Sequence, residues 1–243
     1  QIKSLLAICF LSLSPGSLWA EQLWSDINFS LLKGSNYQVG DDDRIVFTVE
    51  HVSGHNWGDT FLFVDRLKNQ NDDFHQTYGE VSPRLSLSHL TNKQLSSGII
   101  EDVLIAAQWE FNSDHFVSFD NYLLGVGFKL NLSGFNYFDI NIYRRNNETY
   151  ANNNQVTLVW ATPLNVFDNK FLFDGFIDIV DDAGNEFKSG FNFTSQLKVD
   201  LGEAFSLEPD KLFVGIEYVY WKNKFGIDGL TEKNPNLLLK WHF

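Results

Sequence analysis

Apolar and polar residues alternate at a period of two along almost the whole chain. Between residues 191 and 201, Phe, Leu and Val fill most of one set of alternate positions, whereas Asn, Thr, Gln, Lys and Asp fill the other. Successive side chains of a strand point to opposite faces, so the pattern predicts strands with one apolar and one polar face. No long stretch shows the 3.6-residue period of a helix, and one helical turn is predicted within residues 90–97. We therefore expect an all-β chain.

Segments with this alternation follow one another at short intervals. Many reach the roughly 9–11 residues with which a tilted strand crosses a bilayer. The stretches between them are rich in Asn, Asp and Gly, as turns and loops are. The twelve expected strands are 22–33, 44–53, 59–66, 78–88, 102–112, 118–131, 135–144, 154–162, 170–180, 188–201, 211–222 and 234–243.

A soluble β-sandwich also alternates, so other features must separate it from a membrane barrel. The segments are long for a sandwich, whose strands usually have about 5–6 residues. Aromatic residues near the ends of the apolar faces are typical of the girdles of an outer-membrane barrel. They are Trp24, Trp109, Trp160, Tyr218, Tyr220 and Trp241. Because a closed barrel leaves no unpaired backbone in lipid, we expect a twelve-stranded antiparallel transmembrane β-barrel with both termini in the periplasm.

The first residues have the layout of a secretory signal. Lys3 precedes an apolar run at 5–13, and a Pro-Gly break and Ala20 follow. We expect residues 1–20 to be a signal peptide and residues 21–243 to form a single barrel domain. Cys9 is the only cysteine, which excludes an intrachain disulfide and a thiolate metal site. It is either an apolar filler residue of the signal or the cysteine of a lipobox.

Charge and composition exclude several classes of protein. With 31 acidic and 18 basic residues and a net charge of −13, the chain lacks the cationic surface that a nucleic-acid-binding protein needs. An aromatic content of 16% argues against disorder. The six histidines show no recurring metal-ligand spacing. The predicted loop pairs Asp114-His115 and Asp181-Asp182 have no evident nucleophile partner. We expect no metal, no cofactor and no enzymatic activity.

Four stretches carry a family resemblance. They are 198–229, 80–86 (EVSPRLS) followed by Leu90-Thr-Asn, 59–65 (DTFLFVD) and 240–243 (KWHF). On these motifs the chain resembles the nucleoside-specific channel-forming outer-membrane porins, the Tsx-like and OmpK-like proteins, and it is more similar to the OmpK branch. The resemblance implies a monomeric barrel of twelve strands in the outer membrane of a Gram-negative bacterium, with a narrow lumen that passes nucleosides. The outer loops are shorter than those of the Tsx branch.

The inward faces of the strands follow from the acidic residues, because a carboxylate that faces lipid near mid-membrane is costly. A ring in the lumen can stack on a nucleobase, which contributes ~1–3 kcal/mol per base, and a carboxylate can accept hydrogen bonds from ribose hydroxyls. For any one residue, packing or charge balance is the alternative explanation. The predicted solute path is lined by Asp59, Phe61, Phe63, Asp65, Glu80, Arg84, Asp174, Phe176, Asp178, Phe213, Glu217 and Trp221, with Glu50, Lys129, Lys198 and Lys240 completing the charged set.

Pro83 interrupts one of these faces. Proline lacks the N–H that a ladder needs and usually marks a bulge within a strand. It is predicted either to turn Arg84 into the pore or to be a tolerated kink.

The functional hypothesis is an outer-membrane channel for passive uptake of nucleosides or similar small solutes. The alternative is a structural barrel, or a surface receptor for a phage or colicin, without selective transport. The expected partners are nucleosides, outer-membrane lipid and the barrel-assembly machinery, with phage or colicin as a further option and no nucleic acid. The assembly partner is expected because Leu239, Trp241 and Phe243 share one face of the terminal strand.

Overall fold

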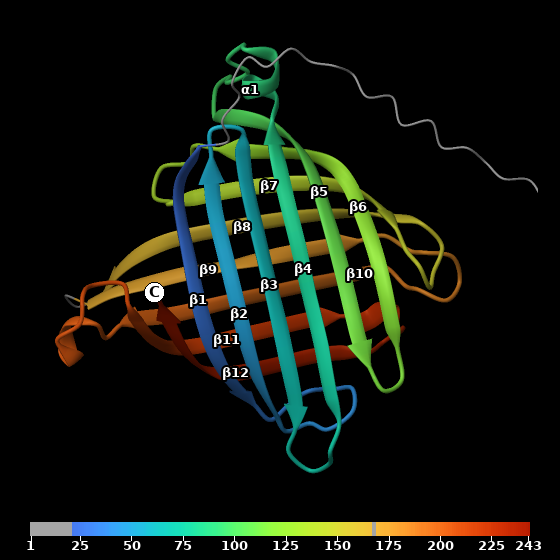
Figure 1. The fold of residues 1–243 in the computed structure, drawn as a ribbon. Helices are drawn as coiled ribbons and strands as arrows, with labels where there is room; N and C mark the ends of the chain where they lie inside the picture. The colour runs from blue at the N-terminus through green and yellow to red at the C-terminus, as the bar shows by residue number, and fades with distance from the viewer. Residues whose placement is uncertain (1–20, 167–168) are drawn as a thin grey trace, which may run out of the picture.

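The chain folds into a closed barrel of antiparallel strands (Figure 1). The computed structural model describes residues 21–166 and 169–243, and the predicted signal peptide lies outside the described residues. The twelve strands are β1 (Gln22–Gly34), β2 (Arg44–His55), β3 (Gly58–Asn69), β4 (His75–Ser86), β5 (Ile100–Asp114), β6 (Ser118–Leu130), β7 (Tyr137–Asn146), β8 (Asn153–Val166), β9 (Asn169–Val180), β10 (Gly190–Asp200), β11 (Leu212–Lys222) and β12 (Thr231–His242). The expectation of a twelve-stranded antiparallel barrel is confirmed.

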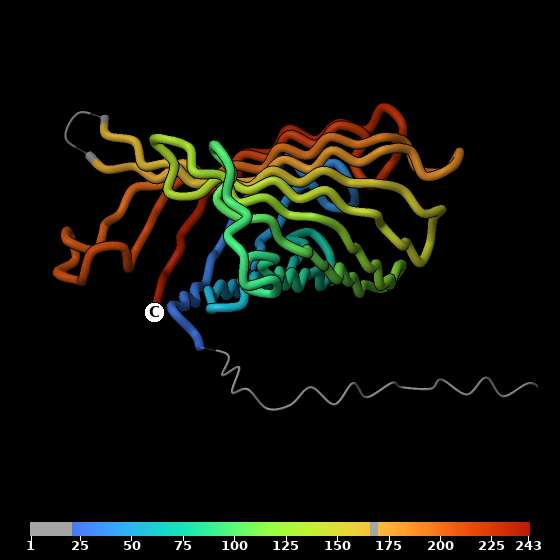
Figure 2. Tube along the Cα trace, turned by 90° about the horizontal axis from the view of Figure 1, so that it is seen from above, coloured from blue at the N-terminus to red at the C-terminus, as the bar shows by residue number. Residues whose placement is uncertain are grey.

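The barrel closes between its first and last strands. Pairing of β1 with β12 runs from Asn28 with His242 to Gly34 with Asn236. Figure 2 shows the C-terminal strand returning beside the start of the described chain. Since every strand has a neighbour on both sides, no sheet edge is left to face lipid. We call the connections at the barrel end opposite Phe243 the outer loops.

Strand ends differ from the predicted ones at both ends of the barrel, most at β8, which ends at Val166 instead of 162. Beside the outer loops the differences reach three residues. β4 begins at His75 instead of 78, and β12 begins at Thr231 instead of 234. The extra residues are paired, Lys68 with His75 and Lys222 with Thr231. Polar residues outside the apolar belt continue the backbone ladder without showing alternation, so the pattern underestimates strand length there.

The predicted helical turn is displaced. It is α1 (Leu87–Thr91) rather than a turn within residues 90–97. Ser86 caps its first turn by accepting a hydrogen bond from the His89 N–H at 3.1 Å, and Asn92 ends it in the left-handed conformation with φ 52°. Two short 3₁₀ turns, η1 (Glu203–Phe205) and η2 (Lys224–Gly226), lie in other connections. Among the described residues, no helix is long and apolar enough to cross a membrane.

Cross-strand register divides the side chains into an inward and an outward set. Asn28, Glu50, Phe63 and Glu80 pair in succession across β1 to β4, so one polar and aromatic row faces the lumen. The residues between them face outward, as shown by Leu31, which is 47% exposed. A lipid-facing apolar wall around a polar interior is typical of an outer-membrane barrel.

Pro83 produces no bulge. Val81 pairs with Trp109 and Arg84 with Ala106, so the register of β4 on β5 is the same on both sides of the proline. The missing N–H leaves a gap in the ladder, and Pro83 itself is exposed on the outward face. Arg84 therefore points inward by simple alternation, and the tolerated-kink interpretation is the correct one.

One aromatic residue was assigned to the wrong side. Trp24 pairs with Gly54, which shares the inward face of β2, so Trp24 does not belong to the lipid-facing girdle. A Cβ at Gly54 would lie 2.3 Å from the Trp24 indole nitrogen, so this close approach requires glycine. Trp160 does face outward, where it packs between the rings of Phe173 and Phe193 with centroids 5.8 Å away in each case.

Candidate solute path in the barrel lumen

All twelve predicted path residues lie on inward faces, but the structure gives them different partners. The first group centres on Arg84. Its Nε and Nη2 donate to the two oxygens of Asp59 at 2.7 and 2.9 Å, and Nη2 also donates to Asp139 at 2.7 Å. Lys129 Nζ lies 2.6 Å from Asp59. Asp59 and Arg84 are thus committed to a charge network across the wall.

The reach of Arg84 from β4 to β7 depends on small inward residues in between. Ala106 on β5 is fully buried beneath it. Gly127 on β6 leaves the space that the Asn141 amide occupies, since a Cβ there would lie 2.6 Å from Asn141 Oδ1. Large side chains at these two positions would separate Arg84 from Asp139.

A second network lies on the opposite part of the wall. Lys198 Nζ donates to Asp174 Oδ2 at 2.6 Å, and Lys240 Nζ donates to Glu50 at 3.2 Å. Lys198 also lies 5.8 Å from the ring centre of Phe213, which is only 5% exposed. Asp174 and Phe213 are therefore engaged with neighbours and do not offer a free carboxylate or ring face.

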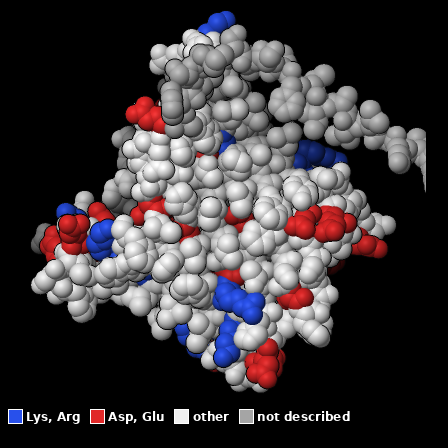
Figure 3. All heavy atoms as spheres, viewed as in Figure 1, with Lys and Arg blue, Asp and Glu red and all other residues white. Residues whose placement is uncertain are grey.

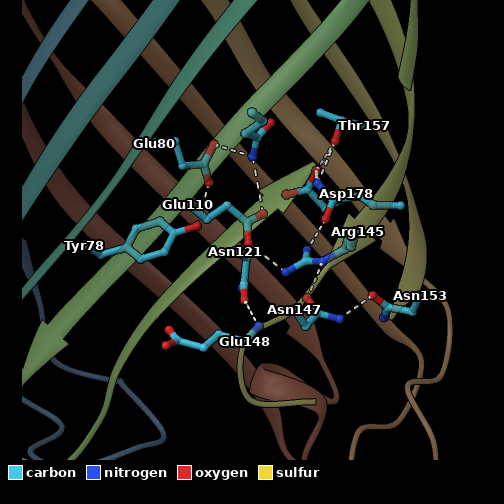
Figure 4. A network of polar contacts seen from close by, with 12 residues as sticks. Tyr78, Glu80, Glu110, Asn121, Arg145, Asn147, Glu148, Asn153, Thr157 and Asp178 are labelled. Carbon is cyan, nitrogen blue, oxygen red and sulfur yellow. Dashed lines mark hydrogen bonds and ion pairs between the residues drawn. The ribbon is translucent and has the colours of Figure 1, made fainter. Parts of the chain in front are cut away.

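A third network joins the six strands from β4 to β9 (Figure 4). Arg145 Nη2 donates to Glu110 at 2.7 Å. Beside this ion pair, Glu80 accepts hydrogen bonds from the Tyr78 hydroxyl at 2.6 Å and from the Gln108 amide at 3.0 Å. The single guanidinium binds Glu110 and leaves Glu80 to neutral donors.

Four carboxylates of the predicted solute path share this property of being held only by neutral donors. Among the described residues, none of the four forms an ion pair, and each keeps part of its surface accessible. Thr48 donates to Asp65 at 2.6 Å, Thr157 donates to Asp178 at 2.6 Å, and Gln196 donates to Glu217 at 2.9 Å. We call Asp65, Glu80, Asp178 and Glu217 the free acids of the lumen.

Three aromatic rings line one continuous part of the inner wall. The ring centres of Phe61 and Phe63 are 5.9 Å apart, and Phe63 is 5.9 Å from Tyr78 on the next strand. All three are half-buried, and Asp65 and Glu80 lie on the same inward faces. We call Phe61, Phe63 and Tyr78 the aromatic wall. Tyr78 is absent from the residues predicted from sequence, although its place two residues before Glu80 puts it on the same face.

The two remaining predicted aromatic residues differ in their surroundings. Phe176 is half-buried on the inward face of β9, where it pairs with Val159 and Thr194. Trp221 has the Phe225 ring 4.9 Å away and the Lys224 ammonium 4.9 Å above its own ring. The structure brings Phe61 and Phe63 together with Tyr78, and it does not bring Trp221 or Phe213 to them.

The outer loop 35–43 folds over the inner side of β1 and β12, which the sequence does not predict. Tyr37 is 9% exposed, and its hydroxyl donates to Asn236 Oδ1 at 3.0 Å. The Gln38 N–H donates to Glu232 at 2.9 Å, and Glu232 is the ion-pair partner of Lys224 at 2.6 Å. Burial raises the pKa of Tyr37 and lowers that of Lys224. The loop therefore narrows this side of the outer mouth.

The acidic loop residues considered for catalysis have structural contacts. Asp114 accepts the N–H groups of Phe116 and Val117 at 2.7 and 2.8 Å. Asp181 accepts the Asn154 N–H at 2.6 Å, and Asp182 accepts that of Ser189 at 2.6 Å. Across the described ranges, no group of three or more His, Cys, Asp or Glu residues could hold a metal ion.

Comparison with known proteins assigns the barrel to a family. The model of the nucleoside-specific channel-forming protein Tsx matches residues 22–236. The chain belongs to this family. The Tsx-family chain is 24% identical over 200 residues to the outer membrane protein OmpK of Vibrio parahaemolyticus, covering 72% of this chain and 75% of OmpK.

Solved porins share the fold. The KdgM porin superposes with a TM-score of 0.51 at 7% identity, covering 90% of this chain and 99% of KdgM. KdgM in complex with disordered oligogalacturonate gives 0.50, with the same identity and coverage. Family and fold together make this Tsx-family protein a channel of the Gram-negative outer membrane. Neither the family nor the fold is that of an enzyme.

Proposed function

We propose that the barrel passes nucleosides by passive diffusion and performs no catalysis. The observation that carries the proposal is the aromatic wall beside the free acids. Phe63 lies between two other rings at 5.9 Å and pairs across the sheet with Glu80. A nucleoside is a flat base joined to a hydroxyl-rich sugar, so it needs a ring face and nearby acceptors at the same time.

The two kinds of contact match the two parts of a nucleoside. A base can stack on a half-buried ring of the wall, which is worth ~1–3 kcal/mol per base. Ribose hydroxyls can donate to carboxylates that have no cation of their own, because those oxygens are held only by hydroxyl and amide donors. Several weak contacts of this kind let a solute move on without being trapped.

The charges of the lumen favour a neutral solute over an anion. Arg84 and Lys198 are each bound to carboxylates, whereas Asp65, Glu80, Asp178 and Glu217 remain without a cation among the described residues. The field of the lumen is therefore negative near the free acids, and it repels a phosphorylated solute.

Flux into liposomes tests the proposal. Purified mature protein in liposomes should admit adenosine and thymidine faster than a neutral disaccharide of similar mass, because the disaccharide has hydroxyls but no flat base. Equal rates for nucleosides and disaccharide would reject nucleoside selectivity and leave a general pore. Protein-free liposomes provide the background rate.

A surface receptor is the second candidate. The loop tips carry Phe74 and Phe116, whose rings stack at 5.6 Å, and Phe116 is 79% exposed. Exposed apolar side chains at a loop tip fit a protein that docks from outside. If a phage or colicin uses this site, Phe116→Ser should reduce its adsorption to cells and leave solute flux unchanged.

A further inference from the structure

Basic side chains gather on the outward surface of the barrel beside the outer loops. They are Lys33 on β1, Arg66 and Lys68 on β3, Lys222 on β11 and Lys233 on β12, here called the basic face. These strands and β2 form one continuous arc, because β11, β12, β1, β2 and β3 are neighbours in that order. Figure 3 shows Lys and Arg side chains grouped on the outside of the barrel toward this end.

On each of these strands the outward face changes from apolar to basic toward the outer loops. On β1 the outward face passes from Leu31 to Lys33, and on β3 it passes from Val64 to Arg66. On β11, Tyr220 precedes Lys222. A border where lipid-facing apolar side chains give way to charged ones marks the level of the lipid headgroups.

The placement is selective in a chain whose net charge is −13. Among the outward positions of the described strands, the only other Lys, Arg, Asp or Glu residues are Glu101, Asp120 and Arg144. Glu101 lies at the other end of the barrel, and Asp120 and Arg144 lie on β6 and β7, away from the arc. The cations of the outer wall are thus concentrated on one side and at one end.

Most residues of the basic face have no acidic partner and are therefore free to bind an anion. Lys33 pairs with Asp43, Arg66 donates to the Thr77 hydroxyl at 2.8 Å, and Lys233 lies 6.0 Å from the Tyr220 ring. With the described residues, Arg66 and Lys68 form no ion pair. Lys33 and Lys68 pair with the same residue of β2, Ile45, from its two sides, so their backbones are about 10 Å apart, twice the strand spacing.

We propose that the basic face binds the phosphorylated sugar headgroup of lipid A, the glycolipid of the outer leaflet. The occupant must be a lipid, because the face continues directly into the apolar lipid-facing wall. Its headgroup must be anionic, because four of the five basic residues are exposed and form no ion pair among the described residues. These four are Arg66, Lys68, Lys222 and Lys233. In the leaflet at this end of an outer-membrane barrel, lipid A supplies those phosphates next to acyl chains. Each Lys or Arg that lies next to anionic headgroups contributes about 1 kcal/mol to the attraction.

Native mass spectrometry of the detergent-solubilised mature protein tests the proposal. The probes are bis-phosphorylated lipid A and the same lipid without its phosphates. The test variant is Arg66→Gln with Lys68→Gln, and the matched control is Arg144→Gln, an outward arginine near the outer end of β7. Heat-modified gel migration and ion conductance show that each variant is folded.

Wild type should bind lipid A more tightly than the phosphate-free lipid. The double variant should bind lipid A roughly 30-fold more weakly, for two lost headgroup contacts, and the Arg144→Gln control should bind like wild type. If the double variant does not fold, Lys222→Gln with Lys233→Gln on the same face should weaken binding to a similar extent. Lipid A binding that is unchanged in the folded variant, or equally weakened by Arg144→Gln, would overturn the proposal.

Discussion

Replacing Phe63 with Ala removes the central ring of the aromatic wall. Phe63 is the ring that contacts both others, at 5.9 Å to Phe61 and 5.9 Å to Tyr78, so its loss leaves two rings without a common neighbour. One lost stacking contact of about 1–2 kcal/mol corresponds to roughly 5–30-fold weaker binding of a base. Ion conductance should stay the same or rise, because the substitution widens the pore.

The assay is block of single-channel current by adenosine, titrated on wild type and on Phe63→Ala. Phe47→Ala is the matched control, because Phe47 lies on the neighbouring strand, faces outward and is 43% exposed. The control should be blocked like wild type. Block of Phe63→Ala as strong as that of wild type would contradict stacking of the base on this ring, and so would an equal loss of block in Phe47→Ala.

Three further substitutions and one titration follow from the same structure. Asp65→Asn removes one free acid, so both nucleoside block and cation preference should fall; an unchanged reversal potential in a salt gradient would argue against a negative lumen. Arg84→Ala leaves Asp139 without a cation among the described residues and Asp59 with Lys129 alone. We expect a loss of about 3–5 kcal/mol of unfolding free energy, read from urea titration of the refolded barrel. A loss below the scatter of that titration would mean that water replaces the guanidinium. Phe243→Asp should lower the amount of assembled protein in the membrane, since the Phe243 ring packs on Phe29 at 4.9 Å at the closing seam; normal membrane levels would exclude an assembly role. The Asn71 backbone N–H donates to Asp41 and holds the pKa of this carboxyl below its ordinary value. The contact between loops 35–43 and 70–74 is therefore stabilised above about pH 4 and lost as pH falls through the lowered pKa. An Asn71 amide signal, followed by NMR, that titrates at or above about pH 4 would contradict this.

The sequence predicts most of the fold because one physical constraint acts on every strand. In residues 59–65, charged residues at both ends of one face cannot be turned toward lipid, so alternation alone places Phe61 and Phe63 inside. The constraint weakens where both faces are polar or exposed. Around Trp24, the neighbouring Ser25 and Asp26 give no clear apolar side, and the tryptophan was assigned outward although it pairs on the inward side.

The pairing of charges within the lumen could not be predicted. Arg84 binds Asp139, a residue three strands away, and this depends on the small inward residues at Ala106 and Gly127 and on the curvature of the wall. Alternation gives the face of each acid but not which acids share a cation. For the same reason the sequence did not separate Asp174, which is paired with Lys198, from Asp178, which is held by Thr157.

Loop conformation was the other unpredicted part. Tyr37 lies in a polar stretch with no periodic pattern, yet it is buried against Asn236 at the opposite end of the sequence. Such a contact forms only after β1 and β12 have closed the barrel. The narrowing of the outer mouth is therefore a property of the closed fold.

Single-channel current through the wild-type barrel in planar bilayers tests most directly whether the inner wall binds nucleosides. We expect a reversible reduction of current that grows with adenosine or thymidine concentration in the millimolar range and is absent with a neutral disaccharide. A current that neither nucleoside changes would contradict such binding and leave a barrel without nucleoside selectivity.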